Sequence, residues 1–192
     1  MSAQPQAARR SGPLVVVLGP SGAGKDTLIT HAAAALGSRS QILFVRRSVT
    51  RPAQTGAEDH DSLSEEGFDA AMEDGRFCFS WAANGLRYGL PHAMTLHLAE
   101  GGVAVVNGSR AAFPALRAVF PGAIAVEVTA RRDILKARLL SRGRESEADI
   151  EARLDRADRF AMEGSAALVI DNSGEVGISV QKLARFLDHL VA

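Results

Sequence analysis

Apolar residues along the chain form short continuous runs, and most of these runs alternate with segments of helical spacing. Residues 14–18, LVVVL, are one such run and predict a buried parallel strand, while residues 26–36 predict a helix. Further strands are predicted at 41–45, 103–106, 123–128 and 168–170, and further helices at 111–120, 133–141, 148–162 and 176–190. Strands that alternate with helices predict an α/β fold with a parallel sheet covered on both faces.

Residues 46–100 break this alternation and predict an antiparallel insertion. A polar, turn-rich stretch comes first, and either Ser62 or Ser64 caps the helix that follows it. Pro91 is suited to the first turn of a later helix. The elements expected here are a helix to residue 74, a strand at 77–83, a hairpin turn at Asn84-Gly85, a partner strand at 87–89 and a helix at 91–100.

Residues 19–26, GPSGAGKD, follow the first predicted strand and open the first predicted helix. Strand, glycine-rich loop and helix are the context that a phosphate-binding loop requires. Glycines let successive backbone N–H groups point at an anion, and the helix N-terminus adds partial positive charge. Lys25 is placed to reach the β- and γ-phosphates, where it acts in catalysis. The residues expected to bind ATP are Gly19, Pro20, Ser21, Gly22, Ala23, Gly24, Lys25, Asp26 and Thr27.

Asp26 departs from the usual loop, in which a Ser or Thr follows the lysine and its hydroxyl ligates Mg²⁺. A carboxylate here adds negative charge beside a triphosphate, which is tolerable when a cation lies between them. We therefore expect Mg²⁺ as a cofactor and Asp26 as its ligand, directly or through water. Thr27 as the hydroxyl donor, and Asp26 as a helix cap, are the alternatives.

Composition excludes several classes of partner. The formal net charge is zero at pH 7, so the chain has no general electrostatic attraction to nucleic acid or to a membrane surface. No apolar run reaches the length of a membrane span, and we expect a cytoplasmic protein. Cys78 is the only cysteine and is expected to be a small core residue in a reducing compartment. The histidines lack metal-ligand spacing, so no structural metal is expected.

Arginines follow the second predicted strand, where ligands bind in open α/β sheets. They are Arg46, Arg47 and Arg51. A planar guanidinium suits a phosphate ester, so these side chains are candidate substrate ligands, with Arg51 the first choice. Solvation at the surface is the alternative for any one of them.

A second group of arginines lies in a charged segment with the composition of a mobile lid. Arg142 and Arg144 are expected to act in catalysis by stabilising the charge on the transferring phosphoryl group. Arg153 follows on the next predicted helix and is a candidate substrate ligand, unless it pairs with Glu151 on a solvated helix face. The expected division of the chain is a disordered tail at 1–12 and one domain at 13–192, with an acceptor-binding insertion at about 46–100 and a lid at about 141–150.

Five segments carry a resemblance to known enzymes. They are GPSGAGKD at 19–26, SVTRP at 48–52, SWAANGLRYG at 80–89, VVNGSR at 105–110 and SRGRE at 141–145. With them the chain resembles the guanylate-kinase-type P-loop kinases and, more closely, the ribose 1,5-bisphosphate phosphokinases of bacterial phosphonate breakdown. The segments span nearly the whole chain after the tail. The resemblance implies a P-loop kinase fold in which helices flank a parallel core sheet.

The same resemblance implies which acceptor contacts are kept and which are lost. Arg51 and Tyr88 are similar to acceptor-phosphate contacts of the guanylate kinases, although Tyr88 packing is the alternative. The glutamate that binds guanine falls near Phe79, the hydroxyl after the Tyr-Gly pair becomes Leu90, and an acidic residue at a strand end is matched by Asn107. Base edges left unpaired cost about 1–3 kcal/mol each, so a sugar phosphate is implied as the acceptor.

Several further candidate site residues have two interpretations each. Glu58 and His60 are placed to hydrogen-bond ribose hydroxyls, and exposed loop polarity is the alternative. Arg46 or Arg47 takes over the charge of an acceptor arginine that the chain lacks. Asn172, at the end of the last predicted strand, contacts adenine or caps the following turn. The substrate-binding residues expected are Arg47, Arg51, Glu58, His60, Tyr88, Asn107 and Arg153.

The implied reaction is the ATP-dependent phosphorylation of ribose 1,5-bisphosphate to 5-phosphoribosyl diphosphate, with release of ADP. The nucleophile is then a phosphate oxygen that is already ionised near neutral pH, so no general base is required. A nucleoside monophosphate kinase is the alternative, and an inactive guanylate-kinase-like binding module is a remote one because Lys25 and its glycines are intact. Beyond the small-molecule substrate, a homodimer is the one assembly considered.

Overall fold

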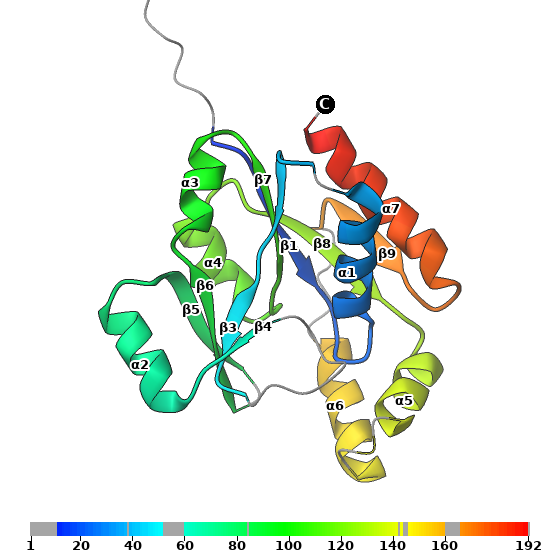
Figure 1. The fold of residues 1–192 in the computed structure, drawn as a ribbon. Helices are drawn as coiled ribbons and strands as arrows, with labels where there is room; N and C mark the ends of the chain where they lie inside the picture. The colour runs from blue at the N-terminus through cyan, green and yellow to red at the C-terminus, as the bar shows by residue number, and fades with distance from the viewer. Residues whose placement is uncertain are drawn as a thin grey trace, which may run out of the picture.

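The computed structural model describes residues 11–37, 39–51, 60–83, 85–141, 143, 146–159 and 166–191. Within these ranges, five strands form a central sheet in which every strand pair is parallel (Figure 1). In spatial order they are β2 (Ile42–Phe44), β7 (Val103–Asn107), β1 (Leu14–Leu18), β8 (Ile124–Thr129) and β9 (Leu168–Asp171). Because β1 lies at the centre, the loop that follows it emerges between β7 and β8.

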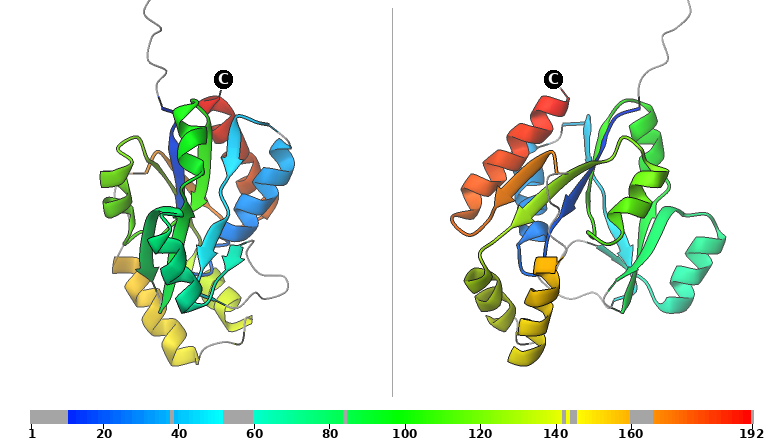
Figure 2. Two further views of the ribbon diagram at one scale, coloured as in Figure 1. Left: turned by 60° about the vertical axis from the view of Figure 1, so that its left-hand side comes forward. Right: turned by 180° about the vertical axis from the view of Figure 1, so that it is seen from behind.

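Both faces of the central sheet are buried, because successive side chains of β1 enter two different cores. The helices that cover the sheet are α1 (Lys25–Leu36), α3 (Met94–Ala99), α4 (Phe113–Val119) and α7 (Val176–Leu190). Val15 and Val17 pack with α1 and α7, whereas Val16 packs with α3 and α4. Figure 2 shows these two pairs of helices on opposite sides of the sheet. The predicted α/β architecture is confirmed, and burial on both faces explains the uninterrupted run LVVVL.

A second, smaller sheet is formed by the segment between β2 and β7. Its strands are, in spatial order, β4 (His60–Ser62), β3 (Arg47–Val49), β6 (Leu86–Pro91) and β5 (Phe77–Ala83). β5 and β6 form the antiparallel hairpin that the sequence predicts, β3 pairs antiparallel with β6, and β4 pairs parallel with β3. Helix α2 (Glu65–Glu73) contacts this sheet through Phe68, whose ring centroid lies 4.8 Å from that of Phe77. The strand β4 was not expected from the polar sequence around it.

One alternative is resolved in this insertion and one prediction is corrected. Ser64 caps α2, because its Oγ accepts a hydrogen bond from the Gly67 N–H at 3.0 Å, while Ser62 lies in β4. Pro91 ends strand β6 and does not open a helix, and α3 begins only at Met94. Proline lacks an N–H, so the end of a ladder suits it as well as the first turn of a helix does.

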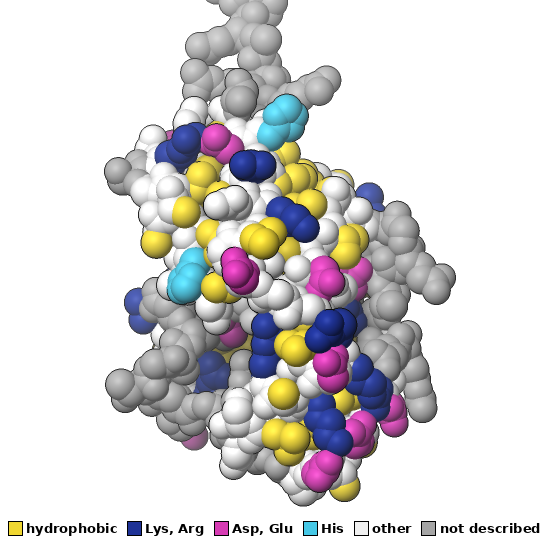
Figure 3. Space-filling view, turned by 90° about the vertical axis from the view of Figure 1, so that its right-hand side faces the viewer, with side chains coloured by type: hydrophobic (Ala, Val, Ile, Leu, Met, Phe, Trp, Pro, Cys, Tyr) yellow, Lys and Arg dark blue, Asp and Glu magenta, His cyan; other side chains and the backbone are white. Residues whose placement is uncertain are grey.

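Helices α5 (Arg132–Ser141) and α6 (Glu147–Arg159) lie beside each other at one end of the molecule (Figure 1). Arg132 Nη2 lies 2.7 Å from carboxylate oxygens of both Glu151 and Asp155, and Lys136 Nζ lies 2.7 Å from Glu147 and 2.8 Å from Glu151. Figure 3, which views the molecule from the right-hand side of Figure 1, shows basic and acidic side chains interleaved on the lower part of the surface. The two helices are therefore joined by a network of charges.

None of the helices in the described part of the chain is long and apolar enough to cross a membrane.

Candidate active site

The loop of residues 19–24 joins the centre of the parallel sheet to the N-terminus of α1. Gly19, Gly22 and Gly24 have φ angles of 145°, 86° and 86°, in the region that favours glycine. A Cβ on Gly19 would lie only 2.1 Å from the carbonyl oxygen of Val128, so this position admits no side chain. The loop thus rests against β8, and the predicted strand, loop and helix follow one another directly.

The side chain of Lys25 folds back over the loop. Its Nζ donates hydrogen bonds to the carbonyl oxygens of Gly19 at 3.0 Å and Pro20 at 3.1 Å. A phosphate oxygen would compete well with these neutral acceptors, because it carries a negative charge that attracts the ammonium group. Thr27, two residues further along α1, is exposed. Its predicted role as a hydroxyl donor stays a prediction.

The loop is held from behind by Asn172 and by Arg138, a residue that the sequence analysis did not single out. Asn172 is 2% exposed, and its Nδ2 donates to Ala23 O at 2.8 Å. Arg138 Nη2 donates to Asn172 O at 2.9 Å, and its Nη1 to Gly22 O at 3.3 Å. Asn172 therefore supports the loop, and its contact with adenine stays a prediction. The sequence offers one signal for Arg138. It is adjacent to Leu139, which is buried, and no acidic residue lies three or four positions away to pair with it on the helix surface.

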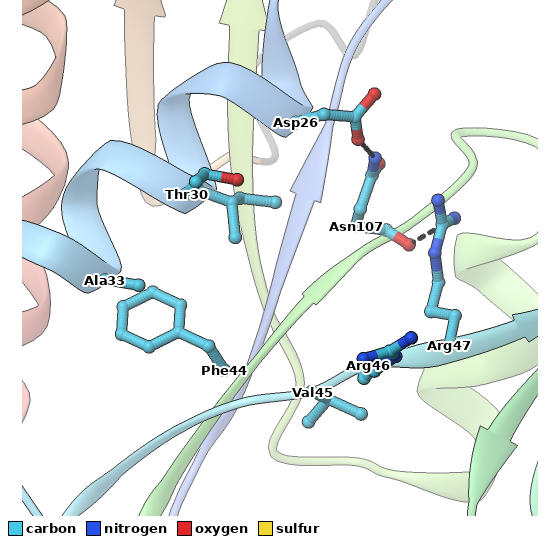
Figure 4. A pocket seen from close by; sticks show the side chains of 9 residues that line it. Asp26, Thr30, Ala33, Phe44, Val45, Arg46, Arg47 and Asn107 are labelled. Carbon is cyan, nitrogen blue, oxygen red and sulfur yellow. Dashed lines mark hydrogen bonds between the residues drawn. The ribbon is translucent and has the colours of Figure 1, made fainter. Parts of the chain in front are cut away.

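Asp26 and Asn107 meet at the edge of a cavity of about 170 Å³ next to the loop (Figure 4). Asn107 Nδ2 donates a hydrogen bond to Asp26 Oδ1. Arg47 lies on the other side of Asn107, and its Nη1 donates to the Asn107 carbonyl oxygen at 2.7 Å. Three predicted site residues from α1, β7 and β3 thus lie in contact.

The guanidinium of Arg47 lies against aromatic rings of the second sheet. Its Cζ is 5.1 Å from the ring centroid of Tyr88 and 5.9 Å from that of Trp81, and these two rings stack 5.0 Å apart. Arg47 is only 6% exposed, and burial lowers its pKa to about 10, against the opposing attraction of Asp26. The side chain therefore keeps its positive charge at neutral pH. It is a buried cation that connects the two sheets.

Arg51 and His60 extend this positively charged region along β3 and β4. Arg51 Nη2 lies 3.5 Å from His60 Nδ1, and Ser62 Oγ lies 3.2 Å from His60 Nε2. Burial, and then the charges of Arg51, Arg47 and Arg46, lower the pKa of His60. A neutral histidine among arginines can accept or donate a hydrogen bond without repelling an anion. The predicted ligands Arg47, Arg51, His60 and Tyr88 are thus brought together by the second sheet.

The side chains at the proposed metal position fit Mg²⁺ bound mainly through phosphate and water. Asp26 supplies one carboxylate at the start of α1, and one of its oxygens is held by Asn107. The described residues contain no group of three or more His, Cys, Asp or Glu that could hold a metal ion. Mg²⁺ commonly uses one or two carboxylates together with substrate phosphates and waters, so a single carboxylate beside a phosphate-binding loop meets its needs.

Several predicted site residues lie elsewhere. Glu58, Arg142 and Arg144 lie outside the described residues. Arg153 lies on α6 next to the buried Leu154, and its own side chain is half-buried. The structure does not place Arg153 among the residues that line the cavity.

Two of the positions that the resemblance matched to guanine contacts, Phe79 and Leu90, are apolar and packed. Leu90 is fully buried in the core beneath α3 and α4. Phe79 packs on the same core and stacks with Trp81 at 5.9 Å. Neither side chain offers a hydrogen bond to the edge of a base. Cys78 packs there as well, and burial raises the pKa of its thiol, as expected for a structural cysteine.

Comparison with known proteins supports the likeness seen in the sequence. No protein-family model matches the chain. The chain is 45% identical over 185 residues to the ribose 1,5-bisphosphate phosphokinase PhnN of Brucella melitensis, covering 96% of this chain and 95% of that protein. It is 42% identical over 188 residues to the protein of the same name from Rhizobium etli, covering 98% and 95%.

A solved structure shares the fold. The guanylate kinase from Anaplasma phagocytophilum matches with a TM-score of 0.69 at 17% sequence identity, covering 94% of this chain and 87% of that one. At this level of identity the likeness concerns the fold alone. The predicted P-loop kinase fold is confirmed.

Proposed function

The chain belongs to the ribose 1,5-bisphosphate phosphokinases, and from that membership we propose how its side chains carry out the reaction of the family. The enzyme is a phosphotransferase that uses ATP to convert ribose 1,5-bisphosphate to 5-phosphoribosyl diphosphate, with release of ADP. The observation that carries this conclusion is identity of more than 40% with relatives of this name over nearly the whole chain. The sequence predicted the same reaction.

ATP binds with its phosphates in the loop of residues 19–24. Backbone N–H groups of this loop and the N-terminus of α1 face the β- and γ-phosphates, as is usual for a strand–loop–helix of this kind. Lys25 exchanges its bonds to Gly19 and Pro20 for phosphate oxygens. Arg138 and Asn172 keep the loop in its binding conformation before ATP arrives. Such preorganisation lowers the cost of ordering the loop on binding.

The acceptor sugar binds between the loop and the second sheet. Arg51 and Tyr88 bind one of its phosphates, and His60 hydrogen-bonds the acceptor from β4. The buried charge of Arg47 strengthens this anion site from behind. The 1-phosphate then faces the γ-phosphate of ATP. Its attacking oxygen is already ionised, so the protein contributes positioning and charge stabilisation and no general base.

When bound, Mg²⁺ would neutralise part of the charge on the phosphates of ATP. Asp26 is its proposed protein ligand, held in place by Asn107. Lys25 stabilises the charge that spreads over the transferring group, and Arg142 and Arg144 are proposed to do the same from the segment between α5 and α6. Arg153, on α6, is proposed to approach the acceptor from the same side.

The reaction is tested with purified protein, ATP, Mg²⁺ and ribose 1,5-bisphosphate, with ³¹P NMR used to detect the new diphosphate. A coupled assay of ADP release compares the sugar with GMP, dGMP, AMP and UMP. We expect turnover with the sugar and at most weak turnover with the nucleotides, because Phe79 and Leu90 offer no hydrogen bonds to a base. Strong turnover with GMP would show that this view of the acceptor site is wrong. Light scattering on the same preparation tests the proposed homodimer.

A further inference from the structure

The contact between Asp26 and Asn107 joins the first turn of α1 to the end of β7, across 81 residues of sequence. We propose that Asn107 is a positioning residue for the Asp26 carboxylate, and that the two side chains form one functional carboxylate–amide pair. The proposal rests on the proposed function in one respect, since it takes Asp26 to be the ligand of the metal ion. It assigns to Asn107 a role through Asp26 and not through the acceptor.

The pair leaves the carboxylate with one oxygen fixed and one oxygen available. Asn107 is a neutral donor, and its Nδ2 binds Oδ1 of Asp26, so Oδ2 remains for a cation or its water. Both side chains line the cavity beside the loop, as Figure 4 shows. An amide partner therefore orients the carboxylate without adding a second negative charge beside the triphosphate.

Asn107 is itself held firmly, because the end of β7 packs closely against β1. It lies at the end of the buried strand β7, opposite Val17 in the parallel register with β1, and it is 9% exposed. The N–H of the next residue, Gly108, donates to Val17 O at 2.9 Å. A Cβ on Gly108 would lie 2.4 Å from Val16 Cγ1, so the backbone here is tightly packed against β1. A donor on such a rigid element can fix a partner in one rotamer.

Arg47 connects this pair to the second sheet. Its Nη1 donates to the Asn107 carbonyl oxygen at 2.7 Å, and its guanidinium lies 5.1 Å from the ring of Tyr88. A line of contacts thus runs from the acceptor side of the site through Arg47 and Asn107 to Asp26. Asn107 therefore contacts both the metal-binding carboxylate and the arginine that borders the acceptor.

The test measures metal binding directly, with Mn²⁺ as the probe for Mg²⁺. The free Mn²⁺ signal in electron paramagnetic resonance is titrated against the full-length enzyme in the presence of ADP. Asn107→Leu keeps the branched shape and the number of heavy atoms of the side chain and removes the donor. We expect it to weaken Mn²⁺ binding by about 10-fold or more, the usual effect of removing an outer partner of a metal ligand. Asp26→Asn is expected to weaken it at least as much.

The reciprocal exchange, Asp26→Asn together with Asn107→Asp, places the carboxylate on the other partner and restores the contact. We expect this double variant to bind Mn²⁺ at least about fivefold more tightly than Asp26→Asn alone, a difference of about 1 kcal/mol in binding free energy. Ser109→Ala is the matched control in the same loop and keeps the wild-type affinity. Asn107→Leu with wild-type affinity, or an exchange no better than Asp26→Asn alone, overturns the proposal.

Two further measurements keep the test informative. Thermal melts show whether Asn107→Leu folds, and if it does not, the smaller Asn107→Ala replaces it. That variant also removes the amide donor, so Mn²⁺ affinity should again fall, and an unchanged affinity overturns the proposal. With sugar and ATP, Asn107→Leu should lower kcat and leave the KM for ribose 1,5-bisphosphate near its wild-type value. A raised KM with unchanged kcat would instead assign Asn107 to the acceptor. If the wild type makes no diphosphate, the proposed function fails while the Mn²⁺ result stands.

Discussion

Replacing Arg138 by methionine removes the support that α5 gives to the phosphate-binding loop. The substitution keeps a long, partly buried side chain and deletes the hydrogen bonds to Asn172 O, Gly22 O and Ala23 O. Only the first, at 2.9 Å, has a good length, and the other two measure 3.3 and 3.5 Å. A hydrogen bond from a charged group contributes about 1.5–3 kcal/mol, so we expect a loss of about 2 kcal/mol in the free energy of unfolding.

For a chain of this size, that loss corresponds to a fall in Tm of about 4–8 °C, measured by calorimetry or circular dichroism. Because the loop must then be ordered when ATP binds, we expect the Kd for ATP to rise about tenfold, measured by isothermal titration. The matched control is Arg131→Met, which removes an exposed arginine whose partner is the equally exposed Asp133. It should leave Tm and ATP affinity unchanged. If Arg138→Met keeps the wild-type Kd and Tm, the loop does not depend on this side chain and the reasoning fails.

Three further predictions address the candidate active site and the packing of the strands that support it. Lys25→Met should fold normally but lower kcat by about 10²–10³, because one donor to the transition state is removed. Unchanged turnover would exclude Lys25 from catalysis. The pKa of His60 is lowered in the folded protein. Between about pH 6.5 and that lowered pKa, His60 is therefore protonated in the unfolded chain only, so the free energy of unfolding should fall as pH drops through this window. Urea midpoints should show the fall in the wild type and a smaller one in His60→Gln. Gly108→Ala should lose about 1–3 kcal/mol in urea unfolding because its Cβ meets Val16, whereas Gly122→Ala, with open space around it, should not.

The sequence was most informative where local pattern and tertiary role coincide. The run LVVVL and the glycines after it predicted a buried strand and a phosphate-binding loop, because both depend on residues next to each other in the chain. Pro91 was misassigned because a missing N–H suits the end of a strand and the start of a helix equally well. Strand β4 was missed because its pairing with β3 comes from another part of the chain and not from its own polar residues.

The sequence named candidate residues of the site but not the contacts between them. Arg47, Arg51, His60, Tyr88 and Asn107 were all expected near the acceptor, and the second sheet brings the first four together. The stacking of Arg47 on Tyr88, and its bond to the carbonyl of Asn107, depend on the packing of two sheets against each other. The helical pattern around Arg138 likewise does not predict that its guanidinium contacts the phosphate-binding loop.

The meeting of Asp26 with Asn107 also has an evolutionary consequence. A change at either position alone leaves an amide without its acceptor, two adjoining carboxylates, or a carboxylate without its donor. Matching changes at both positions avoid all three outcomes. We therefore expect these two positions to covary among relatives, so that they are inherited as a single trait although 81 residues separate them. A survey that scores each column of an alignment separately would count two unrelated substitutions where selection acts on one.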